Sequence, residues 1–371
     1  MNIIISKSEL NRALSMTQSV VERKTTMPIL VNVLLSASDN ALKISATDLE
    51  VTAVVTAGGT VKSTGSTTVN ARVLNDIVRE LPDGDVCLKL TEGERLQITA
   101  HNSHFMMVGI SSEEFPSLPG IGLEAKGKIN ALALREMIDK TIYAVSHDET
   151  RFNLNGVCFE MDKSDTSKLR MVATDGHRLA LIQRPFPELS FDGGAIVPTK
   201  GLQELRKVLD EEGEKEVGIA VTDGFFVVES ARAKLAMRLV DGEFPDYKQV
   251  IPKEAGTMAT LSCDVFTQAI RRAALMVSDK GKCVKLDFSE GKLRLSSSSP
   301  ELGEASEEIE IDYPGEPVSV GFNAKYLLDF ANSVAESNTV RMEISGELGP
   351  TRLMEESDDS YFGIIMPMRL T

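Results

Sequence analysis

The sequence predicts an α+β protein made of three tandem copies of one unit, each with two helices and an antiparallel sheet. Amphipathic helix patterns, alternating strand patterns and turn residues return in the same order about every 125 residues. A chain of 371 residues also exceeds the usual size of one hydrophobic core, so length alone predicts more than one domain.

Each unit opens with apolar residues at helical spacing, within residues 6–24, 130–146 and 264–277. Ser6 to Glu9 has the pattern of a capping box, which marks the start of the first helix. The apolar face of that helix is expected to extend to Val21.

Two strands joined by a turn follow each opening helix. Thr47, Thr174 and Ser298 occupy matching positions in these strands, 127 and 124 residues apart. The second helix of each unit is predicted within residues 70–81, 198–209 and 323–335. Alternating strands such as Val86 to Leu90 and Phe225 to Val227 close the units.

The repeat gives three predicted domains, residues 1–122, 127–253 and 257–371. Loop-like segments around Gly120 and Gly256 separate them. The four cysteines form no CxxC pair and indicate free thiols in a reducing cytoplasm.

The net charge of −15 argues against a simple nucleic-acid-binding surface. The six helical segments nevertheless sum to +5 by formal charge. This distribution fits helices that face a polyanion on an otherwise acidic body, although an ordinary solvated helix surface explains it as well.

Three short motifs suggest chemistry, and each also has a structural interpretation. Gly120 to Ala125 matches a dinucleotide fingerprint but follows no predicted strand, so we interpret it as a linker. His101 and His104 would point to opposite faces of an alternating strand and could not share a metal ion.

The third motif, Asp175 to Arg178, places an acid beside a histidine. No activated nucleophile accompanies them, and the equivalent turns at Asp48 and Ser299 lack the histidine. Asp175 is therefore predicted to be a turn residue, while a structural and a functional role for His177 stay open.

The last residues, Ile364 to Thr371, are unusually apolar. They predict either a final core strand or part of an adaptable groove for partner peptides.

Three long motifs resemble the bacterial DNA polymerase III beta subunit family, the beta sliding clamps. They are Val172–Ala180, Val240–Tyr247 and Met366–Leu370, and the likeness extends over the whole chain. It implies the DNA clamp fold and a head-to-tail homodimeric ring with helices inside and sheets outside. It also implies a non-catalytic processivity subunit without cofactor or metal. The partners it implies are double-stranded DNA, bound without sequence preference, the polymerase III catalytic subunit, the clamp loader, and other polymerases and repair proteins that bind through short peptides.

The resemblance also implies three sets of site residues. The partner-peptide groove would comprise Leu154, Thr174, Gly176, His177, Arg178, Leu179, Pro245, Val250, Ile364, Ile365, Met366, Pro367, Met368, Arg369 and Leu370. The DNA-facing residues would be Lys24, Arg72, Phe152, Asn153, Lys200, Asn323 and Tyr326. The dimer interface would place Phe105 and Met107 of one chain against Leu275 and Met276 of the other.

The sequence departs from the family pattern at three places. Lys248-Gln249 replaces a common arginine pair at the groove edge, Thr199 replaces a common basic residue, and Thr371 extends the usual end. Two rival functions are an enzyme that uses Asp175 and His177, and a three-domain peptide-binding module that does not bind DNA.

Overall fold

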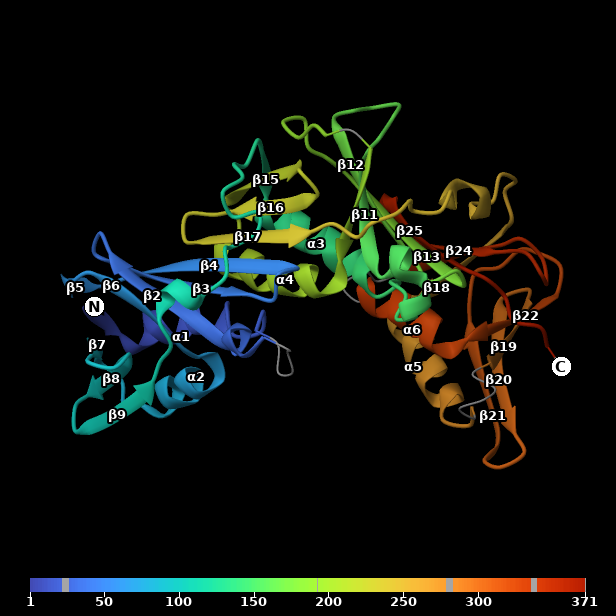
Figure 1. The fold of residues 1–371 in the computed structure, drawn as a ribbon. Coiled ribbons are helices and arrows are strands. Elements are labelled where there is room, and N and C mark those ends of the chain that lie inside the picture. Colours follow the sequence, from blue (N-terminus) through green and yellow to red (C-terminus); the bar gives the residue numbers. More distant parts are fainter. Residues whose placement is uncertain (22–26, 192, 278–282, 335–338, 371) are drawn as a thin grey trace. The chain divides into compact units, whose positions relative to one another are not determined.

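A computed structural model describes residues 1–21, 27–191, 193–277, 283–334 and 339–370. The chain divides into two compact units (Figure 1). The first comprises Met1–Arg135, Glu188–Phe191 and Lys200–Leu239, and the second comprises Glu136–Pro187, Asp192–Thr199 and Val240–Thr371.

The first unit contains two antiparallel sheets. In spatial order, the five-stranded sheet consists of β5 (Thr60–Ser63), β1 (Asn2–Ser6), β7 (Asp85–Thr91), β8 (Arg95–Ala100) and β9 (Ser103–Val108). The eight-stranded sheet consists of β10 (Gly127–Asn130), β15 (Glu216–Thr222), β16 (Phe225–Glu229), β17 (Ala233–Arg238), β4 (Val51–Gly58), β3 (Ala41–Thr47), β2 (Asn32–Ser38) and β6 (Gly65–Asn70). The helices are α1 (Lys7–Ser15), α2 (Ala71–Glu80), nearly all of α4 (Thr199–Glu212), and the 3-10 turns η1 (Pro28–Val31) and η2 (Ser112–Glu114).

The second unit also contains two antiparallel sheets. The eight-stranded sheet consists of β14 (Gly194–Pro198), β11 (Gly156–Met161), β12 (Lys168–Thr174), β13 (Arg178–Pro185), β25 (Asp358–Ile365), β24 (Thr351–Glu355), β23 (Thr339–Ile344) and β18 (Thr257–Ser262). The four-stranded sheet consists of β21 (Gly303–Glu310), β20 (Lys292–Ser299), β19 (Cys283–Ser289) and β22 (Val318–Asn323). The helices are α5 (Cys263–Ala274), α6 (Ala324–Ser333), and the 3-10 turns η3 (Glu149–Leu154) and η4 (Tyr247–Val250), while α3 (Ala131–Ile142) contributes to both units.

The predicted α+β repeat is confirmed. Helices α1 and α2 pack on each other in the first repeat, and α5 and α6 do so in the third. The meanders β2-β3-β4, β11-β12-β13 and β19-β20-β21 occupy matching places in the three repeats. Alternate strand residues are buried, as Val86 and Leu88 show, because one face of each sheet is covered.

The first helix is shorter than predicted, because α1 ends at Ser15 and leaves Val21 outside it. The Ser15 hydroxyl donates to the Arg12 carbonyl at 2.7 Å, and the Thr17 hydroxyl donates to the Ala13 carbonyl at 3.1 Å. Such side-chain bonds compete with the helical backbone pattern and favour a turn.

Only part of the predicted capping box forms among the bonds described. The Ser6 hydroxyl accepts from the Glu9 amide at 3.3 Å, as an N-cap should. The Glu9 carboxylate instead accepts from Arg12 at 3.0 Å and from Arg232 at 3.3 Å.

The strand predicted through His101 and His104 is wrong in detail. His101 lies in the tight turn between β8 and β9 with a φ of 48°, and its ring nitrogen is 3.1 Å from the Asp83 carbonyl oxygen. Only His104 belongs to a strand.

Gly120 to Ala125 is a packed linker and not a phosphate-binding turn before a helix. Ile121 and Leu123 cover an apolar cluster on β15, β16 and β17. Gly120 has a φ of +71°, and a Cβ there would lie 2.7 Å from the Phe225 ring, so glycine is required at this approach.

Both eight-stranded sheets join strands of two successive repeats. Strand β4 of the first repeat pairs antiparallel with β17 of the second. Strand β13 of the second repeat pairs antiparallel with β25 of the third. The chain therefore has two internal joints of the same design, each a continuous backbone ladder.

Ion pairs reinforce the β13–β25 joint. Lys140 contacts Glu355 at 2.8 Å, and Arg184 contacts Asp358 at 2.6 Å. Burial alone would raise the pKa of Asp358, but hydrogen bonds from Arg184 and Ser360 lower it below its ordinary value. The Asp358 carboxylate therefore stays ionised and paired with Arg184 at neutral pH.

Candidate functional site

The candidate site begins at the turn between β12 and β13. The Asp175 carboxylate accepts from the backbone amides of His177 at 2.9 Å and Arg178 at 3.1 Å. Asp48 caps the matching turn of the first repeat in the same way, through the amides of Glu50 and Val51. The prediction that Asp175 is a turn residue is confirmed.

The turn leaves the His177 side chain exposed beside Gly176. Gly176 has a φ of +88°, a conformation that favours glycine. Thr174 is buried, and its hydroxyl accepts from the Gly176 amide at 3.1 Å and donates to the Arg178 carbonyl at 2.6 Å. This threonine therefore shapes the turn.

Arg178 is buried at 6% exposure and fully engaged within the chain. Its guanidinium donates to Asp175 at 3.1 Å, to Asp329 at 2.6 Å and to the Tyr143 carbonyl at 2.5 Å. It also lies over the Tyr326 ring at 4.4 Å. A buried cation needs such partners, so Arg178 fixes the turn against α6.

The structure brings together residues that the sequence assigned to different surfaces. Arg178, predicted for the groove, lines a pocket of about 390 Å³ with Asn323 and Tyr326, both predicted to face DNA. Burial raises the pKa of Tyr326, which keeps its hydroxyl neutral at physiological pH.

An apolar cluster lies directly beside this turn, on the outward face of the β12–β13–β25–β24 ladder. Its buried members are Val172, Leu179, Leu181, Tyr247, Met354, Phe362 and Ile364. Phe244, Ile251 and Met258 pack against it while staying partly exposed. Two predicted groove residues, Leu179 and Ile364, are thus joined by neighbours from four separate stretches of chain.

Partly open apolar side chains border the cluster. Pro245 is exposed, Val250 is 40% exposed and Met366 is 37% exposed. The amide of Met366 donates to the His177 carbonyl at 2.9 Å, so β25 leads directly past the turn.

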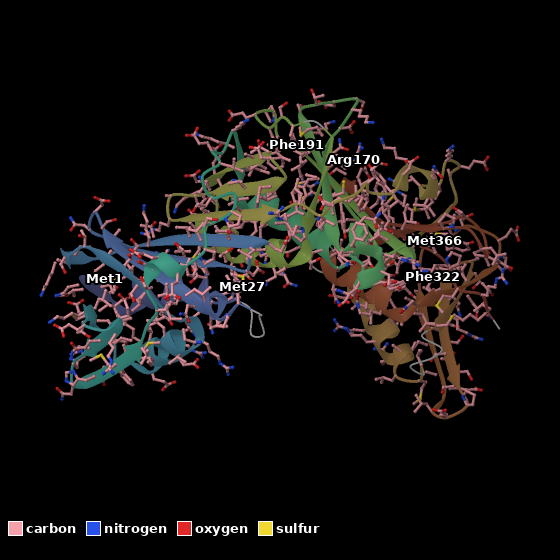
Figure 2. All side chains as sticks on the ribbon, in the orientation of Figure 1. Met1, Met27, Arg170, Phe191, Phe322 and Met366 are labelled. Carbon is pink, nitrogen blue, oxygen red and sulfur yellow. The ribbon has the colours of Figure 1, made fainter. Side chains whose placement is uncertain are left out.

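The terminal segment then crosses to the four-stranded sheet. The Met368 amide donates to the Gly321 carbonyl at 2.8 Å, and the two residues form an isolated bridge. Figure 2 labels Met366 near Phe322, which follows Gly321 on β22. Pro367 and Met368 are half-buried, whereas Arg369 and Leu370 are exposed.

Two further predicted groove residues are buried and do not belong to this apolar cluster. Leu154 is buried at the end of η3, and Ile365 is buried at 2% exposure next to Ile364. Successive strand residues point to opposite faces, so Ile365 and Ile364 cannot both face the cluster.

Sequence reasoning missed most of the cluster floor, including Val172, Leu181, Met354 and Phe362. Alternation offered a signal, because Val172 and Thr174, and likewise Phe362 and Ile364, share a strand face. The pairing of β13 with β25, which unites these faces, has no local signal.

The residues predicted to face DNA differ in their surroundings. Arg72 is 71% exposed beside Asp76 at 3.8 Å, on a hollow of about 830 Å³ that α2 and the Lys207 side chain help to line. Lys200 instead pairs with the carboxylate of Asp48. Lys24 lies outside the described residues.

Two other predicted DNA-facing residues lie on η3. Phe152 is 56% exposed. The Asn153 side chain donates to the Glu243 carbonyl at 2.9 Å and is committed to a neighbouring loop.

The predicted dimer-interface residues lie at two sheet edges. Strand β9 borders the five-stranded sheet, with Phe105 38% exposed but Met107 only 7% exposed. The neighbours Met106 and Val108 are more exposed, at 53% and 77%, and were missed. Leu275, just after α5, is 72% exposed, and Met276 is half-buried.

Catalytic chemistry finds little support at the turn. The Asp175 carboxylate is occupied by two backbone amides and by Arg178. Among the described residues, no group of three or more histidines, cysteines and acids could hold a metal ion. In the same part of the chain, no helix combines the length and apolarity needed to span a membrane.

Three repeats, two inter-repeat sheets and an apolar cluster beside the β12–β13 turn define a sliding-clamp architecture. The chain matches three family models along its length. These describe the N-terminal, central and C-terminal domains of the DNA polymerase III beta subunit, at residues 1–119, 128–246 and 248–369. The chain belongs to this family, whose members are non-catalytic processivity factors of DNA replication.

Full-length relatives agree. The beta sliding clamp of Caulobacter vibrioides is 38% identical, and that of Escherichia coli K12 is 32% identical, each covered completely in both chains. The crystal structure of the Caulobacter crescentus sliding clamp superposes with a TM-score of 0.91 at 37% identity. The Bartonella birtlesii clamp bound to griselimycin superposes with a TM-score of 0.94 at 33% identity. Each of these two matches covers 100% of this chain and 100% of the solved chain.

Proposed function

We propose that two copies of this chain form a closed ring around duplex DNA and tether the replicative polymerase to it. The observation that carries this proposal is the repeated joint, in which one strand meander pairs with the closing strand of the next repeat. A surface that pairs head to tail generates a ring when the rotation closes.

The repeat extends the joint to a second copy. Strands β4 and β13 find their partners in β17 and β25, whereas the matching strand of the third repeat, β21, lies at a sheet edge. The matching closing strand of the first repeat, β9, also lies at an edge. Pairing β21 with β9 of another copy would satisfy both edges.

The internal joints also predict the register of this contact. Thr52 pairs with Ala236, and Leu179 pairs with Ile364. Matching turns and hairpins place Glu304 and Met106 at the corresponding positions, so Ala305 would pair with Phe105 of the second copy. That register directs Phe105 toward the helix-covered face, where Leu275 and Met276 follow α5.

We place domains at residues 1–122, 127–253 and 257–371, so that each would supply two helices to the inside of the ring. Arg72, Phe152, Asn153, Lys200, Asn323, Tyr326 and Lys24 are assigned to the DNA-facing surface. Sliding requires weak, screened contacts with phosphates and not contacts with base edges. Exposed cationic side chains such as Arg72 can make such phosphate contacts.

The apolar cluster and its open border are assigned to partner peptides. Leu179, Pro245, Val250 and the segment from Ile364 to Leu370 would form the groove, which the polymerase catalytic subunit, clamp loader and repair proteins share in the cytoplasm. A Caulobacter crescentus clamp structure with polyethylene glycol bound at a region proposed to tether the beta motif supports such a site in the family.

The first prediction concerns the joint. Changing Leu275 and Met276 together to alanine should weaken each joint by about 2–5 kcal/mol, because buried apolar contacts are lost. Analytical ultracentrifugation should show dissociation at concentrations where the parent chain stays dimeric. Leu348→Ala, at an equally exposed leucine in the β23–β24 loop, is the matched control and should stay dimeric.

The register itself can be tested by cross-linking. A chain with Ala305→Cys and Phe105→Cys should form a covalent dimer under mild oxidation, since directly paired residues face the same side. The pair Ser306→Cys and Phe105→Cys should not, because adjacent strand positions face opposite sides. Equal cross-linking of both pairs would contradict the assigned register.

The second prediction concerns DNA. The ring should bind linear DNA weakly and lose that binding steeply as salt rises. After loading onto closed circular DNA by the clamp loader, it should be retained in gel filtration until the circle is cut. Equal loss from circular and linearised DNA would show that the linkage is not topological.

The third prediction concerns the groove. Removing residues 366–371 should abolish binding of a fluorescent partner peptide while the dimer persists, because the open border is lost but β25 remains. Burial of two apolar anchors contributes about 1.5–3 kcal/mol of binding free energy each. The entropic cost of ordering the peptide offsets part of this gain, so we expect a roughly micromolar affinity. Unchanged anisotropy titrations for the shortened chain would place the groove elsewhere.

A further inference from the structure

The segment from Phe244 to Ile251 forms one wall of the assigned groove but has little regular structure of its own. Its only helical element is the four-residue turn η4, whose N-cap Asp246 makes no side-chain cap bond. Pro245 and Val250, which it carries, are exposed. The position of this wall must therefore be set by contacts outside the segment.

Tyr247 supplies such a contact from the middle of the wall. The residue is 7% exposed, and its ring belongs to the apolar cluster. Its hydroxyl donates to the Glu160 carboxylate at 2.5 Å and accepts from the Arg170 guanidinium at 3.1 Å. Burial, and then the bond to Glu160, raises the pKa of Tyr247, so the hydroxyl keeps its proton at neutral pH.

Arg170, which is labelled in Figure 2, lies on β12 and is held in turn by neighbouring strands of its sheet. Glu160, Arg170 and Gln183 are paired neighbours on β11, β12 and β13 and share one face. The guanidinium donates to Glu160 at 3.1 Å, to Gln183 at 3.1 Å and to the Asp162 carboxylate. Its side chain is only 14% exposed, so these bonds form away from bulk solvent.

A polar cluster at this depth contributes little net stability, because desolvation offsets the attraction between the charges. Its specific effect is directional, since the Tyr247 hydroxyl fits both partners at only one height above the sheet. Val250 lies three residues after Tyr247, at the end of the same turn. Fixing Tyr247 therefore fixes the exposed apolar side chain that borders the groove.

We propose that Arg170 and Glu160 are positioning residues for partner binding, which hold the groove wall in its binding position through Tyr247. They act on the peptide through Val250 and Pro245. This inference rests on the assignment of the groove to partner peptides. The ligand class is a short peptide with two apolar anchors, one of which contacts the wall.

The test begins with Tyr247→Phe, which keeps the ring in the cluster and removes only the hydroxyl. Affinity for a short fluorescein-labelled peptide with a leucine and a phenylalanine as anchors should fall about tenfold, because both hydrogen bonds that tie the wall to charged groups, those to Glu160 and Arg170, are lost. The dimer, measured by light scattering, should be unchanged. Tyr313→Phe is the matched control, because Tyr313 is equally buried and donates to the Glu316 carbonyl at 2.8 Å. It should bind the peptide like the parent chain.

A double-mutant cycle separates positioning from a general loss of stability. Val250→Ala should weaken binding by several-fold in the parent chain but have almost no effect in Tyr247→Phe, because the displaced wall no longer presents Val250. Additive effects of the two changes would overturn the proposal. If Tyr247→Phe fails to fold, Glu160→Gln replaces it in the same cycle, since glutamine keeps the side-chain shape and removes the charge.

The deletion of residues 366–371 distinguishes this proposal from that of the groove. If the deletion abolishes peptide binding but Tyr247→Phe and Glu160→Gln leave it intact, the positioning role is refuted and the groove assignment stands. Binding that survives the deletion would refute both.

Discussion

The pairing of strands across repeats is the constraint on which the rest of this structure depends. At each internal joint a complete backbone ladder links two repeats, β4 with β17 and β13 with β25. A ladder fixes both register and facing, since a slip of one residue would turn every side chain to the opposite side. The apolar cluster exists only because this pairing sets Leu179 beside Ile364. The proposed ring and the proposed groove thus depend on the same kind of contact.

Much of the fold could be predicted from the sequence because its signals are local. Helix periodicity, alternation and turn residues placed α2 to α6 and the start of α1 close to their observed bounds and identified Asp175 as a turn residue. The end of α1 was misplaced because Ser15 and Thr17 bond back to the helix, an effect that apolar spacing does not record. His101 was misplaced because a tight turn interrupts the strand pattern.

The candidate site was less predictable, because its parts meet only through long-range pairing. Family likeness identified Leu179 and Ile364 but not Val172, Met354 or Phe362, which complete the cluster from neighbouring strands. It also grouped Thr174 and Arg178 with the groove, although the structure commits both to holding the turn. Asn323 and Tyr326, assigned to DNA, line the same pocket as Arg178. The position of a side chain in a motif does not show whether that side chain contacts a ligand or holds in place another side chain that does.

The two internal joints share a backbone design but differ in the side chains on their outward faces. Where the second joint has Val172, Leu179 and Phe362, the register gives the first joint Ser45, Thr52 and Lys234, and Lys234 pairs with Glu229 at 3.0 Å. The apolar cluster beside these polar positions, which includes Ala236, is already covered by Ile121 and Leu123, so an apolar anchor finds no open apolar surface there. The docking point of the second joint is therefore not repeated at the first, although the backbone design is. In the proposed ring each chain would offer one such docking site. Proteins that need the same DNA would therefore compete for two sites per ring.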